Sequence, residues 1–382
     1  YGGGIAGTIE IKGKKAATDR WHGVLDISDI DASFLVEGPL TKKISVLASA
    51  RRSFIGDIAE FVTKTLDDYF PFTMSTFYWD YLLRTDFNFS KNNHLFITLF
   101  GNRDSLALIV PEMDEGSDEI SDAQDRFGMN ITTHLAMAGW DLKINDKISN
   151  SARYAISSLY SGWTPFGFLK STSEGLNHYI RDQLTFRFND KLSLITGLDI
   201  ELGTWDIDLT IQDGLGKIET SKDKDWFFGE TGAYLNLEWK PFKKLLLIPG
   251  IRYDYYSELI HDGSIMPEFW NYNDFNNSRG ISGDPSLRLS SRYQINDDHI
   301  VKAAIGNYNQ TPKPVGQAIH KVWGNPLLAT TKAAHFVAGH EWRITDIINS
   351  DVQFYFNNQW DIPDFANSQD INLTGEKQVL MY

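Results

Sequence analysis

Polar and apolar residues alternate along much of the chain, in stretches where every second side chain is apolar. The pattern is clearest in residues 77–89, 226–239 and 351–360. In the first stretch the odd-numbered positions are mainly aromatic or aliphatic, whereas the even-numbered positions include Asp80 and Asp86. Because successive side chains of a strand point to opposite faces, these stretches predict β-strands with one apolar and one polar face.

The length of the predicted strands is a second signal. They run for about 10 to 14 residues, whereas strands of globular proteins are most often about 5 to 6 residues long. A tilted strand needs about 9 to 11 residues to cross a bilayer. Strand length therefore favours a sheet that spans a membrane.

Two kinds of connection alternate between the strands. The short ones are rich in Asn and Asp, which tolerate the backbone angles of tight hairpins; they lie at residues 90–93, 145–146, 189–190 and 296–298. The long ones are predicted at residues 55–75, 104–125, 164–175, 207–224, 258–282, 310–332 and 361–382. Within the first of them, apolar residues at helical spacing predict a short helix over 56–70. Short periplasmic turns and long extracellular loops are typical of a bacterial outer-membrane β-barrel.

The predicted fold class is therefore all-β, a transmembrane antiparallel up-and-down β-barrel. We expect about 15 strands, and because bacterial barrels have an even number, we also expect strands beyond the C-terminal end. The ends of the sequence, Tyr1-Gly2-Gly3-Gly4 and Met381-Tyr382, do not resemble native termini. The sequence is thus expected to be a fragment, with a barrel that is incomplete at its C-terminus.

Composition narrows the class of protein and its partners. Aromatic residues make up 13% of the chain, which suits the interface belts of a membrane barrel or a protein- or carbohydrate-binding surface. The net charge of −14 argues against nucleic acid, whose binding depends on Lys and Arg at phosphates. The absence of Cys excludes disulfides and Cys metal sites. The mean hydropathy of −0.30 still fits a barrel, because alternate residues of its strands face a wet lumen.

Several short segments, taken in order, carry a resemblance to a known family. They are residues 1–13 (YGGGIAGTIEIKG), 34–40 (FLVEGPL), 45–53 (SVLASARRS), 284–290 (DPSLRLS), 304–312 (AIGNYNQTP), 325–328 (NPLL) and 339–341 (GHE). The first resembles the end of the plug domain of TonB-dependent outer-membrane receptors. The next two resemble the early barrel hairpin of that family, especially as it appears in receptors of Bacteroidota, and the others resemble its mid-barrel strands.

This resemblance implies a barrel of about 22 strands filled by an N-terminal plug. Residues 1–19 would be the C-terminal end of the plug domain and residues 20–382 the β-barrel domain. The implied function is active uptake of a scarce nutrient with energy supplied by TonB. The nutrient would be an iron chelate, a vitamin, an oligosaccharide or a peptide. A passive porin or an adhesion-type barrel is the alternative function, and it leaves the plug-like start without an explanation.

The resemblance also implies the location and the partners. The location is the outer membrane of a Gram-negative bacterium. The partners are the TonB complex, outer-membrane lipid and lipopolysaccharide, and a small-molecule or oligomeric nutrient; a surface lipoprotein is a further candidate. The TonB-binding segment, most of the plug, the last strands and the C-terminal aromatic residue of the family have no counterpart in these residues.

Charged residues within the predicted strands are candidates for the lining of the lumen. They are Asp80, Arg84, Asp86, Arg252 and Asp254. They would contact an anionic ligand or, as we favour, the plug and one another. Arg51 and Arg52 are adjacent and cannot both face the lumen.

Aromatic residues in the long connections are the candidates for ligand contact. They are Trp163, Phe166, Phe168, Phe269, Trp270, Tyr272 and Trp323. Stacking rings suit sugars, aromatic chelators or peptides. Packing between loops or an outer interface belt is an equally good explanation.

Other motifs give no support for an enzyme, a cofactor or a metal site. Gly2-x-Gly4-x-x-Gly7 matches a dinucleotide fingerprint in letters, but a predicted strand follows it where the mechanism requires a helix. His335 and His340 are five residues apart and would lie on opposite faces of a strand. The acidic segment 104–125 lacks EF-hand spacing, so a solvated loop is favoured over a Ca²⁺ site.

Overall fold

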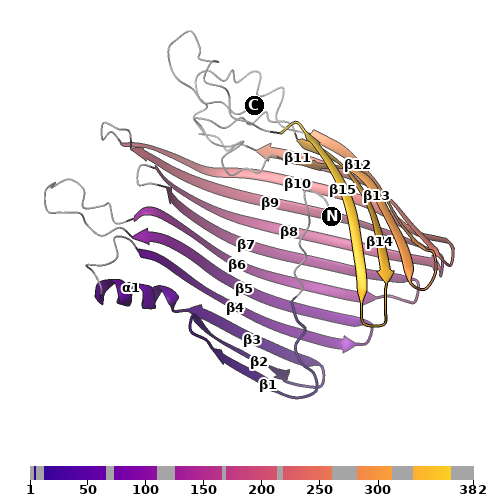
Figure 1. Ribbon diagram of the computed structural model, residues 1–382, viewed down its shortest axis with the longest axis horizontal. Coiled ribbons are helices and arrows are strands. Elements are labelled where there is room, and N and C mark those ends of the chain that lie inside the picture. The colour runs from indigo at the N-terminus through magenta and orange to yellow at the C-terminus, as the bar shows by residue number, and fades with distance from the viewer. Residues whose placement is uncertain are drawn as a thin grey trace, which may run out of the picture.

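A computed structural model describes residues 4–5, 13–65, 73–109, 125–165, 169–212, 218–259, 282–311 and 330–362. These residues form one curved sheet of fifteen strands, in which each strand pairs antiparallel with the next one along the chain (Figure 1). The predicted fold class and strand number are confirmed. Among the described helices, none is long and apolar enough to cross a membrane.

The strands are β1 His22–Ile27, β2 Asp31–Pro39, β3 Ile44–Ser53, β4 Thr73–Ser90, β5 Asn93–Ile109, β6 Asp125–Lys143, β7 Ile148–Pro165, β8 Leu169–Asn189, β9 Leu192–Gln212, β10 Ile218–Phe242, β11 Leu245–Leu259, β12 Ser282–Gln294, β13 His299–Gln310, β14 Thr331–Arg343 and β15 Asn349–Trp360. The predicted helix is present as α1, Ile55–Thr65, with Asp57 in its first turn.

The central strands are longer than predicted, and two predicted loops are largely strand. β8 and β9 have 21 residues each and β10 has 25. The predicted connection 207–224 is therefore wrong for most of its length, because Ile207 pairs with Asp223 in the β9–β10 ladder. The connection 164–175 is likewise shortened by β7 and β8. At the start of β10, residues 219–224 are polar on both faces, and at the end of β9 the apolar Trp205 and Ile207 are buried, so the alternation with an apolar outer face that marks a membrane span is missing there.

The short turns lie together at one end of the sheet (Figure 1). The side chain of Asn145 accepts hydrogen bonds from the backbone N–H of Lys147 and Ile148 at 2.8 and 2.9 Å. Asn296 makes the same pair of bonds to Asp298 and His299. The predicted Asn-rich turns are thus confirmed, with an Asn side chain accepting from the turn backbone at Asn145, Asn189 and Asn296 and the Ser90 hydroxyl doing so in the turn 90–93. At the opposite end the β1–β2 connection, residues 28–30, is short, so the alternation of turn lengths fails there.

The two faces of the sheet differ as the sequence predicts. In β4, Arg84 and Asp86 are 6% and 2% exposed, whereas Leu83 on the other face is 45% exposed. In β11, buried Arg252 alternates with exposed Ile251. Among the described residues, fifteen of the buried ones are polar or charged and eight are apolar, so the interior is polar and the outer surface is apolar. Such an arrangement suits a lipid-facing exterior and a polar lumen.

Candidate functional site

The segment that precedes β1 is called the N-terminal segment below, and the structure describes its residues 4–5 and 13–21. It lies against the polar face of the sheet, called the inner face below. The carbonyl of Ile5 is 2.8 Å from His335 Nε2 in β14, and its N–H donates to Gln310 in β13. Farther along, the N–H of Ala16 donates to Asp86 Oδ2 in β4 at 3.1 Å. The segment is therefore bonded to strands from both halves of the sheet.

Asp86 is the centre of the first inner-face cluster. It accepts hydrogen bonds from Arg84 Nε and Nη2 at 2.9 and 2.7 Å, and lies 2.8 Å from His94 Nε2. The Ala16 N–H is the further donor on this carboxylate. A buried carboxylate is costly unless its charge and lone pairs are satisfied, and here donors from β4, β5 and the N-terminal segment meet that need.

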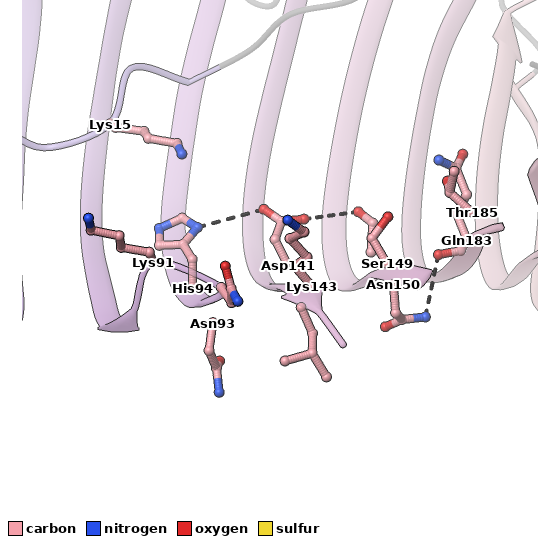
Figure 2. Close-up of a pocket in the computed structure, with 13 residues that line it drawn as sticks. Lys15, Lys91, Asn93, His94, Asp141, Lys143, Ser149, Asn150, Gln183 and Thr185 are labelled. Carbon is pink, nitrogen blue, oxygen red and sulfur yellow. Dashed lines mark hydrogen bonds and ion pairs between the residues drawn. The ribbon is translucent and has the colours of Figure 1, made fainter. Parts of the chain in front are cut away.

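His94 extends this cluster to the neighbouring strands. Its Nδ1 atom lies 3.6 Å from Asp141 Oδ2 in β6, as the dashed line in Figure 2 shows. Asp141 also accepts a hydrogen bond from Arg153 Nη2 in β7 at 2.6 Å. The guanidinium groups of Arg84 and Arg153 lie 4.1 and 5.0 Å from the centre of the Phe96 ring. Four strands are thus linked through one chain of charged and polar side chains.

A cavity of about 340 Å³ lies beside this chain, near the short turns (Figure 2). Its lining includes Lys91, Asp141 and Lys143 from the barrel and Lys15 from the N-terminal segment. Lys143 Nζ is also 2.6 Å from Asp146 in the turn, and this hydrogen bond holds the pKa of the Asp146 carboxyl below its usual value. The cavity is polar and its walls come from both parts of the chain.

A second inner-face cluster crosses β8 to β11. Asp199 accepts hydrogen bonds from Arg181 Nε at 2.6 Å and from Arg252 Nη1 at 2.5 Å, and Arg252 Nε donates to Asp254 at 2.6 Å. The Arg252 guanidinium passes directly over Gly232, where a Cβ atom would lie 1.9 Å from Nη2. A cavity of about 330 Å³ adjoins this cluster. Only glycine at position 232 leaves room for this arrangement.

The predicted lumen residues lie on the inner face and are paired. Arg84 bonds Asp86, Arg252 bonds Asp254, and Asp80 accepts from Arg51 Nε at 2.7 Å. The prediction that Arg51 and Arg52 face opposite sides of the sheet is confirmed. Arg51 bonds Asp80 on the inner face, whereas the guanidinium of Arg52 lies over the Phe77 ring on the outer face.

The predicted ligand-contacting aromatic residues fall mostly outside the described residues. Trp163 is described, and it lies within strand β7 instead of a loop, 44% exposed. The others lie outside the described part of the chain: Phe166, Phe168, Phe269, Trp270, Tyr272 and Trp323. Ligand contact at all of these positions stays a prediction. The expectation of a solvated loop instead of a Ca²⁺ site at 104–125 also stays a prediction, because residues 110–124 lie outside the described part.

The two histidines of β14 lie on opposite faces, as predicted. His335 contacts the N-terminal segment on the inner face. His340 Nε2 is 3.1 Å from His299 Nδ1 of β13 instead. Within the described residues, no group of three or more metal-ligating side chains is present.

Sequence reasoning missed several members of the two clusters, namely His94, Asp141, Arg153, Arg181 and Asp199. Each occupies an inner-face position of its strand, so continuing the alternation through every strand would have found them. Which of them meet depends on the register between strands. The pairing of Asp86 with Phe96 places His94 beside Asp86.

Residues 59–378 match the family described as "TonB dependent receptor-like, beta-barrel". The ferripyoverdine receptor of the outer membrane of Pseudomonas aeruginosa, solved with bound ferripyoverdine, superposes with a TM-score of 0.65 at 13% identity, over 97% of this chain and 52% of that one. The siderophore receptor PirA from Acinetobacter baumannii gives 0.63 at 13% identity, over 92% and 54%. The copper transporter OprC gives 0.60 at 12% identity, over 88% and 52%.

This chain thus spans about half the length of these solved structures. No curated protein sequence matches it.

Proposed function

This chain belongs to the TonB-dependent receptor-like β-barrel family, and we propose that it is the barrel wall of a receptor for a scarce nutrient, with the end of a plug on its inner face. The protein is located in the outer membrane of a Gram-negative bacterium. Receptors of this family are transporters, in agreement with the prediction that the chain is not an enzyme.

The N-terminal segment is the observation that supports a plugged barrel over an open porin. Its backbone is bonded at Ile5 to β14 and at Ala16 to β4, so its described residues contact the inner face in both halves of the sheet. Residues 1–19 are proposed as the end of the plug and residues 20–382 as the barrel. The buried charge clusters link the strands of the wall beside this segment, because each carboxylate accepts hydrogen bonds from arginines of its own or neighbouring strands.

The proposed substrate to test first is a metal chelate of the siderophore class. The solved structures that this chain resembles include receptors for siderophores and a copper transporter. Energy would come from TonB. Vitamins, oligosaccharides and peptides are the other substrates that we propose to test.

Growth on defined nutrients tests this proposal. A strain lacking the gene is compared with the complemented strain on siderophore-bound iron, cobalamin and oligosaccharides, with and without TonB. We expect growth on one of these nutrients to require both the receptor and TonB. Growth that needs the receptor but continues without TonB would favour the passive porin.

A further inference from the structure

The short turns of the sheet carry an uneven distribution of charge. The five turns between β2 and β11 contain seven lysines against two aspartates, although the whole chain has a net charge of −14. The lysines, called the basic arc below, are Lys42, Lys43, Lys91, Lys147, Lys191, Lys243 and Lys244. The next two turns, 295–298 and 344–348, contain three aspartates and no Lys or Arg.

The basic arc is free to bind a partner. All seven lysines are exposed. Lys244 Nζ donates to the carbonyl of Ile295 at 2.9 Å, and the other six side chains form no ion pair or hydrogen bond within the described residues. One of the two aspartates, Asp146, is already paired with Lys143 outside the arc. The positive charge of these turns is therefore not neutralised by the chain itself.

Exposed aromatic residues place these turns at the edge of the bilayer. On the outer face, close to the short turns, five large rings are between 40% and 52% exposed: Phe89, Trp140, Trp239, Tyr293 and Trp342. The indole N–H of Trp140 donates to Asn93 Oδ1 at 2.9 Å, so its polar edge is directed toward the turn end of the sheet. Aromatic belts of this kind lie at the level of the lipid headgroups.

We propose that the basic arc binds the phosphate groups of anionic phospholipids in the periplasmic leaflet of the outer membrane. Lys91 lies just after Phe89 at the end of β4, and Lys243 lies just after Trp239 at the end of β10. The lysine ammonium groups and the exposed aromatic rings therefore lie at the same end of the sheet. Lysines beside a membrane surface attract anionic headgroups, whereas the acidic turns 295–298 and 344–348 repel them. Anionic lipid is thus expected along β2–β11 and not along β12–β15.

Native mass spectrometry of the protein released from micelles tests this proposal, with phosphatidylglycerol and phosphatidylethanolamine of the same acyl chains as probes. The arc variant is Lys43→Gln/Lys243→Gln. The control is Lys170→Gln/Lys332→Gln, which removes two lysines at the opposite end of the strands. We expect about a five-fold weaker affinity for phosphatidylglycerol for each arc lysine that contacts a phosphate, and no change in the control.

Two results would overturn the proposal. The first is an arc variant that binds phosphatidylglycerol as tightly as the wild type. The second is a wild-type protein that does not prefer phosphatidylglycerol over phosphatidylethanolamine, in which case an acidic protein is the better partner for the arc. Heat-dependent mobility of the folded barrel in detergent gels checks that both variants fold. No nutrient is used, so failure here leaves the proposed uptake function untouched.

Discussion

The backbone N–H of Ala16 donates a hydrogen bond to Asp86 Oδ2, linking the N-terminal segment to β4 across 70 positions of the chain. The same carboxylate holds Arg84, and its side chain is only 3% exposed. The buried Asp86 carboxylate is therefore hydrogen-bonded both to the barrel wall and to the N-terminal segment.

Replacing Asp86 by Asn is expected to destabilise the barrel strongly. A neutral amide leaves the buried guanidinium of Arg84 without its counter-charge, and breaking a buried pair in this way costs about 3 to 5 kcal/mol. Urea unfolding of the protein in lipid vesicles measures the loss. Limited proteolysis reports the second effect, an N-terminal segment that is cut sooner than in the wild type.

Asp80→Asn is the matched control for this substitution. Asp80 also pairs with an arginine, but the Arg51 side chain is 48% exposed. An exposed pair contributes about 0 to 1 kcal/mol, so this variant is expected to remain close to the wild type. Equal losses in the two variants would show that burial of the Asp86 cluster is not what stabilises it.

The contact between Gly232 and Arg252 predicts that a larger side chain at position 232 destabilises the barrel. A methyl group at 232 would lie 1.9 Å from Arg252 Nη2 and 2.5 Å from Asp254 Oδ1. Because Arg252 is held by both Asp199 and Asp254, the guanidinium cannot move aside without breaking a bond. Gly232→Ala is therefore expected to lower the free energy of unfolding by about 1 to 3 kcal/mol.

Gly128→Ala separates this effect from the general effect of replacing a strand glycine. No described atom lies within 4 Å of a Cβ at position 128. Alanine costs less conformational entropy than glycine in a strand, so this variant is expected to be as stable as the wild type or slightly more stable. Unfolding in urea, with both variants in the same vesicles, measures the difference.

Much of the barrel could be predicted because the membrane imposes a simple rule on each strand. Lipid on one side and a polar lumen on the other require alternation, and this placed Arg84 and Asp86 on the inner face from the sequence alone. The rule ends where the strand leaves the membrane. There, residues 219–224 of β10 are polar on both faces, and the apolar Trp205 and Ile207 of β9 are buried on the inner face, so the backbone ladder between β9 and β10 continues without an apolar outer face.

The candidate site was only partly predictable, for a different reason. Arg84–Asp86 and Arg252–Asp254 are two residues apart on one strand, so spacing alone reveals them. Asp199 joins Arg252 from another strand, 53 positions away, and this contact depends on a register that the sequence does not specify. Residues of the inner face could be identified, but not their partners.

Asp146 gives a test of the electrostatics outside the membrane. Its pKa is lowered from 3.8, mainly by the hydrogen bond from Lys143. A lowered carboxyl pKa stabilises the folded state above the unfolded pKa, and the contribution is lost as the pH falls through the folded pKa. Lys143→Gln is expected to raise the pKa of Asp146 toward 3.8, as measured by carboxyl carbon NMR of aspartate-labelled protein.

Asp146→Asn assigns the resonance in that titration, and Lys147→Gln is the control. Lys147 lies in the same turn but makes no bond to the Asp146 side chain within the described residues. Its removal is expected to leave the titration of Asp146 nearly unchanged. An equal shift in both lysine variants would mean that the general positive charge of the turn lowers the pKa.

The exposure of Trp140 and the direction of its indole N–H predict the depth at which the sheet lies in the bilayer. Its ring is 43% exposed on the outer face, and its indole N–H is bonded to Asn93 at the turn end. The fluorescence of Trp140, taken as wild type minus Trp140→Phe, is expected to be quenched more by lipids brominated near the headgroup than by lipids brominated near the chain end. Trp205 is 7% exposed on the inner face, so the corresponding Trp205→Phe difference should not depend on bromine position. Stronger quenching of Trp140 by the deep bromines would place the short turns below the headgroup region and contradict the aromatic belt.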